Sequence, residues 1–284
     1  MVIATLNRRA SLAACLESVL ALDHPSFEVL VCVDPRGDTS PGALARIAET
    51  DSRVRVLVSE RAAGVSATRN AGVLAAAGEL VFFTDDDVIV PADWLRHGCG
   101  RFAEVEVVGI EGRIVYVSDD YRQRYGDRVV ENHTGGMFMT ANAAYRRAAL
   151  LAVGMFDETL ARFEDRELAH RLHDHGVVRY APECVVYHQH VRYTFASFLA
   201  EAARVGPMLR VMKRTGHRSH LVGPVYAPAK LVAIACPPVI LLRLLERRIG
   251  SVSDFAFLAL AYPRLCCERL LLWRAAAVER YFVV

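Results

Sequence analysis

Short apolar runs alternate with amphipathic helical patterns along the first half of the chain, and this alternation constrains the fold more than any other feature. The apolar runs have the length and the β-branched content of buried strands. They lie at residues 27–34, 54–58 and 79–85, after a short opening run at 1–5, and the helical patterns lie at 10–22, from 40 onward and at 66–77. Strands that alternate with helices predict a sheet with parallel strands, covered by helices on both faces.

The middle of the chain continues this pattern less regularly. We expect a strand with a bend at Gly109 or Gly112, a polar loop, two helices and a last strand. The strand is predicted at residues 104–117, the polar loop at 118–133, the two helices at 143–153 and 164–175, and the last strand at 183–190. The predicted class is therefore α/β, with a mixed sheet between two layers of helices.

From Phe195 onward the pattern is helical and rich in arginine. Two apolar segments stand out, at residues 231–242 with two prolines inside and at 255–267. Both are shorter than the roughly 20 residues that a membrane-spanning helix needs. We expect a helical C-terminal region that attaches to a membrane surface without crossing it; the alternative is a soluble helical subdomain that covers the core or a second subunit.

Charge and cysteine content exclude several classes. The net charge is +2, so nothing indicates a nucleic-acid partner. The seven cysteines include no C-x-x-C pair, which argues against a zinc site and a disulfide framework and favours a cytoplasmic location. No basic stretch followed by an apolar run marks a signal peptide at the start of the sequence.

Three consecutive carboxylates, Asp85, Asp86 and Asp87, follow the run at 79–85. In sheets of this kind ligands bind beyond the carboxyl ends of the strands. Carboxylate oxygens suit Mg²⁺ or Mn²⁺, particularly where phosphates complete the coordination. The triplet therefore predicts a metal site, with a solvated acidic turn as the alternative.

Two further strand ends carry polar side chains. Asp34 can accept hydrogen bonds from a nucleobase or a ribose, although Asp34 to Gly37 also reads as an ordinary turn. His188 and His190 are two residues apart on the last strand, so they share a face and can reach a metal or a diphosphate. A purely structural role is the alternative for the two histidines.

Asp165 lies at the start of a predicted helix and shares a face with the apolar residues 168, 169 and 172. This spacing predicts that Asp165 points inward and that Glu164 lies on a wetter side with Glu167 and Arg171. A carboxylate held inward at a helix start is suited to act as a general base. An ordinary acidic N-terminal residue is the alternative.

The ordered motifs T-x-N-R, V-D, A-T-R-N-x-G, T-D-D-D, G-G-x-F and E-D resemble those of the family 2 glycosyltransferases of the GT-A fold, over about residues 1 to 195. The resemblance implies a nucleotide-diphosphate-sugar donor, an acceptor with a hydroxyl group, and Mn²⁺ or Mg²⁺. It also assigns roles to individual residues. By this resemblance the nucleoside is contacted by Thr5, Asn7 and Asp34, Asp86 belongs to the donor site, and Arg69 lies near the diphosphate or braces the metal loop. Asp87 is the main metal ligand, Asp85 faces the ribose and the metal, and His188 or His190 contacts the metal or a phosphate. Asp165 is the base.

One metal site and one opposing base imply a single displacement with inversion at the anomeric carbon. We expect such an enzyme in cell-envelope or secondary-metabolite glycosylation, with residues 1–115 binding the donor, 116–195 binding the acceptor, and 196–284 forming the helical region. A polyprenyl-phosphate acceptor remains an alternative.

Two other classes fit the sequence less well. A nucleotidyltransferase would carry a glycine-rich basic loop after the first strand, where TLNRRAS has no glycine. A noncatalytic sugar-binding protein would not require Asp85, Asp87 and Asp165 together.

Overall fold

The computed structural model describes most of the chain, in two compact units. The described residues are 1–6, 9–37, 39–59, 64–117, 125–189, 191–216, 221–222, 225–226, 228–238, 249 and 251–281. The first unit comprises Met1–Tyr116 and Val130–Gln189, and the second comprises Val117–Val129 and His190–Val284. The predicted site residues Asn7 and His190 lie outside the described residues.

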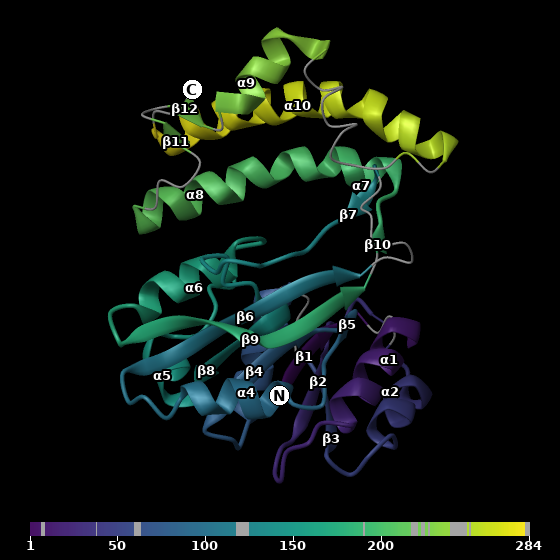
Figure 1. Ribbon diagram of the computed structural model, residues 1–284, viewed down its shortest axis with the longest axis vertical. Coiled ribbons are helices and arrows are strands. Elements are labelled where there is room, and N and C mark those ends of the chain that lie inside the picture. Colours follow the sequence, from purple (N-terminus) through teal and green to yellow (C-terminus); the bar gives the residue numbers. More distant parts are fainter. Residues whose placement is uncertain are drawn as a thin grey trace. The chain divides into compact units, whose positions relative to one another are not determined.

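An eight-stranded mixed sheet forms the centre of the first unit (Figure 1), in the order β3-β2-β1-β4-β8-β6-β9-β5. The strands β3, β2, β1 and β4 are parallel, whereas β8 runs antiparallel to both β4 and β6. Their bounds are β1 Val2–Thr5, β2 Val29–Val33, β3 Val54–Val58, β4 Leu80–Asp85, β5 Val88–Ile89, β6 Val107–Val117, β8 Ala143–Arg146 and β9 Val177–Gln189. The parallel strands therefore end at one edge, where ligands of such sheets bind.

Helices cover both faces of this sheet, as the sequence predicts. Val29, Val31 and Val33 of β2 pack into the core cluster that also contains residues of α1, α2 and α4. The alternate residues Leu30 and Cys32 pack with residues of α3, α5 and α6 on the opposite face. These helices are α1 Arg9–Leu20, α2 Pro41–Ala48, α3 Val65–Ala75, α4 Trp94–Arg101, α5 Arg147–Ala152 and α6 Glu164–Leu172.

The prediction of a single helix at residues 143–153 is wrong in its first part. Residues 143–146 form β8, which fills the position between β4 and β6, and α5 begins only at Arg147. Ala143, Ala144 and Tyr145 are almost fully buried there. The pairing of β8 with two strands distant in sequence outweighs the helix propensity of the alanines, because local preferences yield to tertiary contacts.

β6 is one continuous strand through the two glycines at which a bend was expected. Gly112 is instead a point of close approach, since a Cβ there would lie 2.2 Å from Asn142 Nδ2 and 2.4 Å from the Cys184 carbonyl oxygen. The last strand of the first unit, β9, is longer than predicted because it begins at Val177 and not at residue 183.

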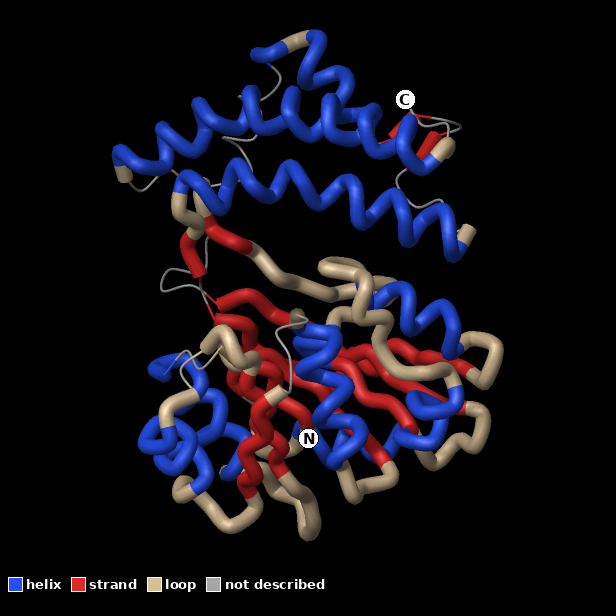
Figure 2. The backbone as a smooth tube through the Cα atoms, turned by 180° about the vertical axis from the view of Figure 1, so that it is seen from behind, coloured by secondary structure: helices blue, strands red, loops and turns tan. Residues whose placement is uncertain are grey.

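The second unit is mainly helical, as predicted, and its helices α8 and α10 pack side by side (Figure 2). The predicted apolar segment at 255–267 is part of α10, a 28-residue helix with Pro263 inside it. In the other apolar segment, at residues 231–242, the helix α9 ends at Ala235. Residues 239–242 lie outside the described residues. Among the described helices, none combines the length and apolarity that a membrane span requires. The elements are β7 Asp127–Arg128, β10 Val191–Arg192, α7 Phe195–Ala200, η2 Glu201–Arg204, α8 Val205–Thr215, β11 Leu221–Val222, β12 Val225–Tyr226, α9 Pro228–Ala235 and α10 Val252–Glu279.

A buried cluster of charges joins three segments of the second unit. Arg192 on β10 forms an ion pair with Asp254 in the first turn of α10 and lies 3.6 Å from Asp127 Oδ1 on β7. The side chains of Asp127 and Asp254 are both fully buried. Asp254 also accepts a hydrogen bond of 2.9 Å from the Ser251 amide, which completes the cap of α10. The cluster thus ties the segment around β7 to the C-terminal helices.

Candidate active site

The acidic triplet lies at the carboxyl end of β4, and its members point in different directions. Asp86 is fully buried and accepts a hydrogen bond of 2.5 Å from Thr5 Oγ1 at the end of β1. The Asp85 side chain is 29% exposed, whereas Asp87 is buried. Asp86 therefore joins the ends of two neighbouring parallel strands, while Asp85 and Asp87 turn to a common side.

Asp85, Asp87 and His188 form a candidate metal centre. One ligand atom from each side chain lies within 4.8 Å of the other two, and His188 Nε2 is 3.3 Å from Asp87 Oδ1. The strand pairing brings these residues together, because Val88 on β5 pairs with His188 on β9 and the Gln189 amide donates a hydrogen bond to the Asp87 carbonyl. Two carboxylates with one imidazole are a donor set that suits Mn²⁺ and accommodates Mg²⁺.

Arg69 on α3 connects this centre to the start of α6. Its Nη2 lies 3.3 Å from Asp85 Oδ1 and its Nη1 lies 2.7 Å from Glu164 Oε1. The arginine is only 7% exposed, so both ion pairs are largely shielded from water. The neighbouring Asn70 exchanges two hydrogen bonds with the backbone of Phe156, at 2.9 and 3.0 Å. The A-T-R-N segment therefore fixes both the acidic loop and the approach to α6.

Asp165 is a half-buried carboxyl group in the first turn of α6. Burial, and then repulsion from Glu164, raise the pKa of Asp165 to about 7, although the Arg166 amide and the charges of Arg69 and Arg166 act in the opposite direction. A carboxyl group that titrates near neutral pH is suited to exchange a proton with a hydroxyl group.

The prediction that Glu164 and Glu167 lie on a wet side of the helix is wrong. Glu164 is 7% exposed and paired with Arg69, and Glu167 is buried and makes two hydrogen bonds to Arg171, at 2.8 and 2.7 Å. Arginines placed beside both glutamates compensate for the loss of hydration, which otherwise keeps carboxylates on the surface. The spacing of apolar residues along a helix does not show which glutamates will have an arginine partner, so it could not predict the burial of these two.

Asp34 lies at the end of β2 and is engaged in a turn. Its carboxylate accepts hydrogen bonds from the Arg36 amide at 2.9 Å and from the Arg36 guanidinium at 2.8 and 2.7 Å. These bonds with Arg36 lower the pKa of Asp34 despite its burial. The geometry is that of the predicted turn, and contact of Asp34 with a nucleoside remains a prediction.

Glu111, which was not among the predicted site residues, organises the G-G-M-F loop at residues 135–138. Its carboxylate accepts hydrogen bonds from the backbone amides of Gly136, Met137 and Phe138, the last two at 3.0 and 2.8 Å, and from the Asn132 side chain at 3.1 Å. Arg166 Nη2 lies 3.0 Å from the sulfur of Met137, so the loop also contacts α6. The sequence feature that could have pointed to this residue is a single glutamate inside an otherwise apolar strand.

The order of the mixed sheet, with carboxylates at the end of β4, is that of the GT-A fold. Residues 1–159 match the family model described as Glycosyl transferase family 2, and the chain belongs to this family. Membership in a family of enzymes does not favour the noncatalytic sugar-binding alternative.

Known proteins similar to this chain include the pre-mycofactocin glycosyltransferase of Mycobacterium tuberculosis, which is 31% identical over 169 residues, covering 54% of this chain and 36% of that protein. The chain spans about half, or less, of the length of the curated relatives it matches. Among solved structures, the mannosyltransferase PcManGT of Pyrobaculum calidifontis, in complex with GDP-Man and Mn²⁺, superposes with a TM-score of 0.63 at 20% identity over 98% of this chain and 85% of that chain. S. aureus TarS, in complex with UDP-GlcNAc, gives a TM-score of 0.56 at 17% identity over 93% of this chain and 71% of that chain.

Proposed function

We propose that this family 2 glycosyltransferase is metal-dependent and inverting, and that it moves a sugar from a nucleotide-diphosphate donor to an acceptor hydroxyl. The observation that carries the proposal is the chain of buried ion pairs from Asp85 through Arg69 to Glu164. It links a three-ligand cluster directly to the helix turn that holds a carboxyl group of raised pKa.

Asp85, Asp87 and His188 would hold the cation, and their two carboxylates and one imidazole fit Mn²⁺ or Mg²⁺. When bound, a divalent cation supplies neutralisation of the charge that develops on the departing diphosphate. Arg69 fixes the carboxylate of Asp85 through its ion pair and brings a second positive charge to the same region. The Mn²⁺ and GDP-Man in the mannosyltransferase of the same fold support this assignment.

In this proposal Asp165 takes the proton of the acceptor hydroxyl as the oxygen attacks the anomeric carbon. Retention would need a second carboxylate that is available as a nucleophile. The neighbouring Glu164 does not meet this need, because it is buried and held by Arg69. A single displacement with inversion is therefore the proposed course of the reaction.

The donor contacts are proposed from the strand ends around the cluster. Thr5 and Asp34 end neighbouring parallel strands, and the Asp34 amide donates a hydrogen bond to the Thr5 carbonyl at 2.9 Å. They would bind the nucleoside together with Asn7, and His190 would supply a further metal or phosphate contact. We place the enzyme on the cytoplasmic side, with an acceptor from cell-envelope or secondary-metabolite glycosylation.

A thermal-shift panel of nucleotide sugars, each with and without Mn²⁺, tests the proposal. Because a ligand that binds only the folded state raises the melting temperature by mass action, a matching donor should stabilise the protein by about 2.7 kcal/mol at a hundred times its Kd. The shift should disappear in EDTA. Product analysis with the matching donor should then give the inverted anomer. The absence of any metal-dependent shift across UDP, GDP, CDP and dTDP sugars would contradict the proposal, and a retained anomer would contradict the inverting mechanism.

A further inference from the structure

Exposed apolar side chains line one face of the long helix α10. They lie in two groups, Val252 and Phe255 in the first turn and Leu270, Trp273 and Val278 in the C-terminal part of the helix, and are 87, 59, 61, 46 and 74% exposed. The opposite face is buried, with Phe257, Leu265, Leu272 and Ala276 inside the unit. A helix of 28 residues is about 42 Å long. We call the five exposed side chains, which lie toward its two ends, the α10 stripe.

The charge of the chain is divided unequally between its two parts. Residues 190–284 contain fourteen arginines and lysines against five acidic residues, a net charge of +9. Residues 1–189 contain twenty basic and twenty-seven acidic residues, a net charge of −7. The small net charge of the whole chain therefore conceals a strongly cationic C-terminal part, and this part carries the stripe.

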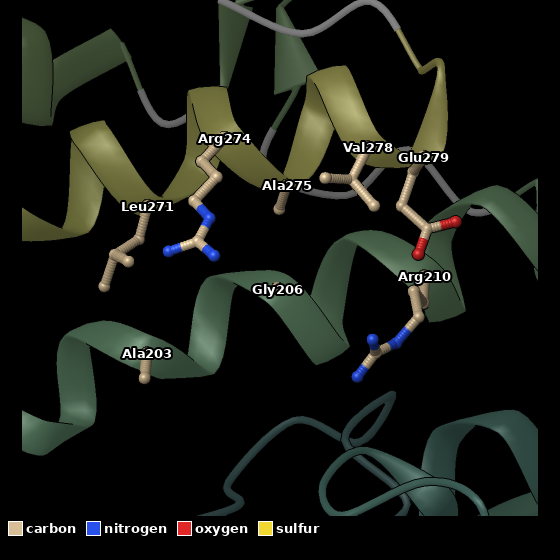
Figure 3. Close-up of a pocket in the computed structure, with 8 residues that line it drawn as sticks. All are labelled: Ala203, Gly206, Arg210, Leu271, Arg274, Ala275, Val278 and Glu279. Atoms are coloured by element: carbon tan, nitrogen blue, oxygen red, sulfur yellow. The ribbon is translucent and has the colours of Figure 1, made fainter.

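A pocket of about 200 Å³ lies between α8 and α10, and it adjoins the stripe (Figure 3). Small residues allow the two helices to approach, since a Cβ on Gly206 would lie 4.0 Å from the Ala275 methyl group. Arg210 on α8 and Arg274 on α10 line the pocket, together with Val278 of the stripe. Within the described part of the chain, neither of these two arginines forms an ion pair, so both guanidinium groups are available to an anion.

We propose that the C-terminal part docks on an anionic phospholipid surface, with the α10 stripe against the boundary between headgroups and acyl chains. The pocket at Arg210 and Arg274 would then receive a lipid phosphate. Helices that lie in a membrane interface combine an apolar face with cationic flanks in this way. A second copy of the chain fits less well, because it would bring a charge of +9 against +9. The inference goes beyond sugar transfer and does not depend on the metal site.

Trp273 provides a native reporter for the test. The chain has two tryptophans, and Trp94 is fully buried in the first unit whereas Trp273 lies in the stripe. With the full-length protein and vesicles of 30% phosphatidylglycerol in phosphatidylcholine, we expect a blue shift of the tryptophan emission, less quenching by acrylamide, and flotation with the vesicles. Pure phosphatidylcholine vesicles should give none of these changes. Trp273→Phe should abolish the blue shift while the protein still floats.

Matched variants distinguish binding through the α10 stripe from binding through any exposed apolar side chain. Leu270→Ser with Val278→Ser should lower vesicle partitioning at least tenfold, and Arg210→Gln with Arg274→Gln should lower it selectively for anionic vesicles. Val105→Ser, which changes an 87% exposed apolar residue in the first unit, should have no effect. The metal-dependent nucleotide-sugar shift should be unchanged in all of these variants, which keeps the failure of this inference distinct from the failure of the proposed function.

Three outcomes would overturn the inference. One is equal binding to neutral and anionic vesicles. Another is protection of Trp273 by millimolar inorganic phosphate without flotation, which would assign the pocket to free phosphate. The third is a stable dimer in light scattering that Leu270→Ser dissociates, which would assign the stripe to a second copy of the chain.

Discussion

At the scale of single residues, Asp87 offers the sharpest test of the metal centre. It is buried, lies 3.3 Å from His188 and has no exposed surface role to confuse the result. We expect Asp87→Asn to reduce transfer at least a hundredfold and to abolish Mn²⁺-dependent binding of the donor, measured by calorimetry, with an unchanged circular dichroism spectrum. The matched control is Asp23→Asn at an 81% exposed side chain, which should behave as the wild type. Full activity of a folded Asp87→Asn protein would refute the assignment.

If Asp165 is the base, the turnover number should depend on pH. A base must be ionised, and burial and Glu164 raise the pKa of this carboxyl group to about 7. Below that pH the group is protonated, so the turnover number should fall about tenfold for each pH unit on the acid side and level off above neutrality. Asp165→Asn should keep donor binding, lose turnover and lose the acid limb. A profile that stays flat from pH 5 to pH 8 in the wild type would exclude Asp165 as the base.

Replacement of Glu164 should shift the pH dependence of the turnover number. Its negative charge is the second cause of the raised pKa of Asp165, so Glu164→Gln should lower that pKa and move the acid limb to lower pH. The variant should also be less stable by roughly 3–5 kcal/mol, because Arg69 loses a buried partner. Glu167→Gln is the control, since it changes a carboxylate on the same helix that pairs with Arg171 instead. An unmoved acid limb in Glu164→Gln, measured by initial rates, would contradict the coupling.

Local patterns predicted part of the site for a physical reason. Asp85 ends β4, and Asp86 and Asp87 form the turn that follows, so a run of carboxylates after a predicted strand was enough to indicate a site at this edge of the sheet. The position of His188 beside them follows from the register of β9 on β5, which no local pattern encodes. The ion pair between Arg69 and Glu164 joins residues 95 positions apart. This ion pair depends on tertiary packing and was not predicted, whereas a metal contact of His188 was expected from the resemblance to the family.

At the scale of elements, Glu111 holds the G-G-M-F loop on β6. Glu111→Gln would turn an amide donor toward backbone amides that also donate, so we expect a loss of about 2–3 kcal/mol of stability in urea unfolding. Hydrogen exchange at Met137 and Phe138 should become faster. The control is Glu79→Gln, at a surface ion pair with Arg146, where the expected loss is below about 1 kcal/mol. Equal losses in the two variants would show that Glu111 is not the anchor of the loop.

Strand and helix prediction succeeded where one periodicity dominates. The strand at residues 54–58 and the start of α2 at Pro41 agree with the structure, because β-branched runs and a proline in the first turn are strong local signals. It failed at β8, whose alanines favour a helix and whose strand form depends on neighbours at both sides.

At the scale of the whole molecule, Arg192 joins three segments of the second unit. Arg192→Ala removes the cation beside the buried carboxylates of Asp127 and Asp254, so we expect a loss of roughly 3–5 kcal/mol in the stability of this unit. Scanning calorimetry should show the loss in the transition that nucleotide sugar does not shift. Arg179→Ala, at an exposed ion pair with Glu104, should cost less than about 1 kcal/mol. Similar costs for the two variants would remove the proposed role of the cluster.

The pairing of β7 with β10 has a consequence for how the protein is made. Asp127 and Arg128 of β7 leave the ribosome before the whole of β9, yet their partners, Val191 and Arg192, follow more than sixty residues later. Because a growing chain generally folds its N-terminal parts first, the strands of the first unit can pair before β7 has its partner strand. The two units are thus interleaved in the order of synthesis, and the C-terminal part is not a cassette that recombination could exchange at a single junction.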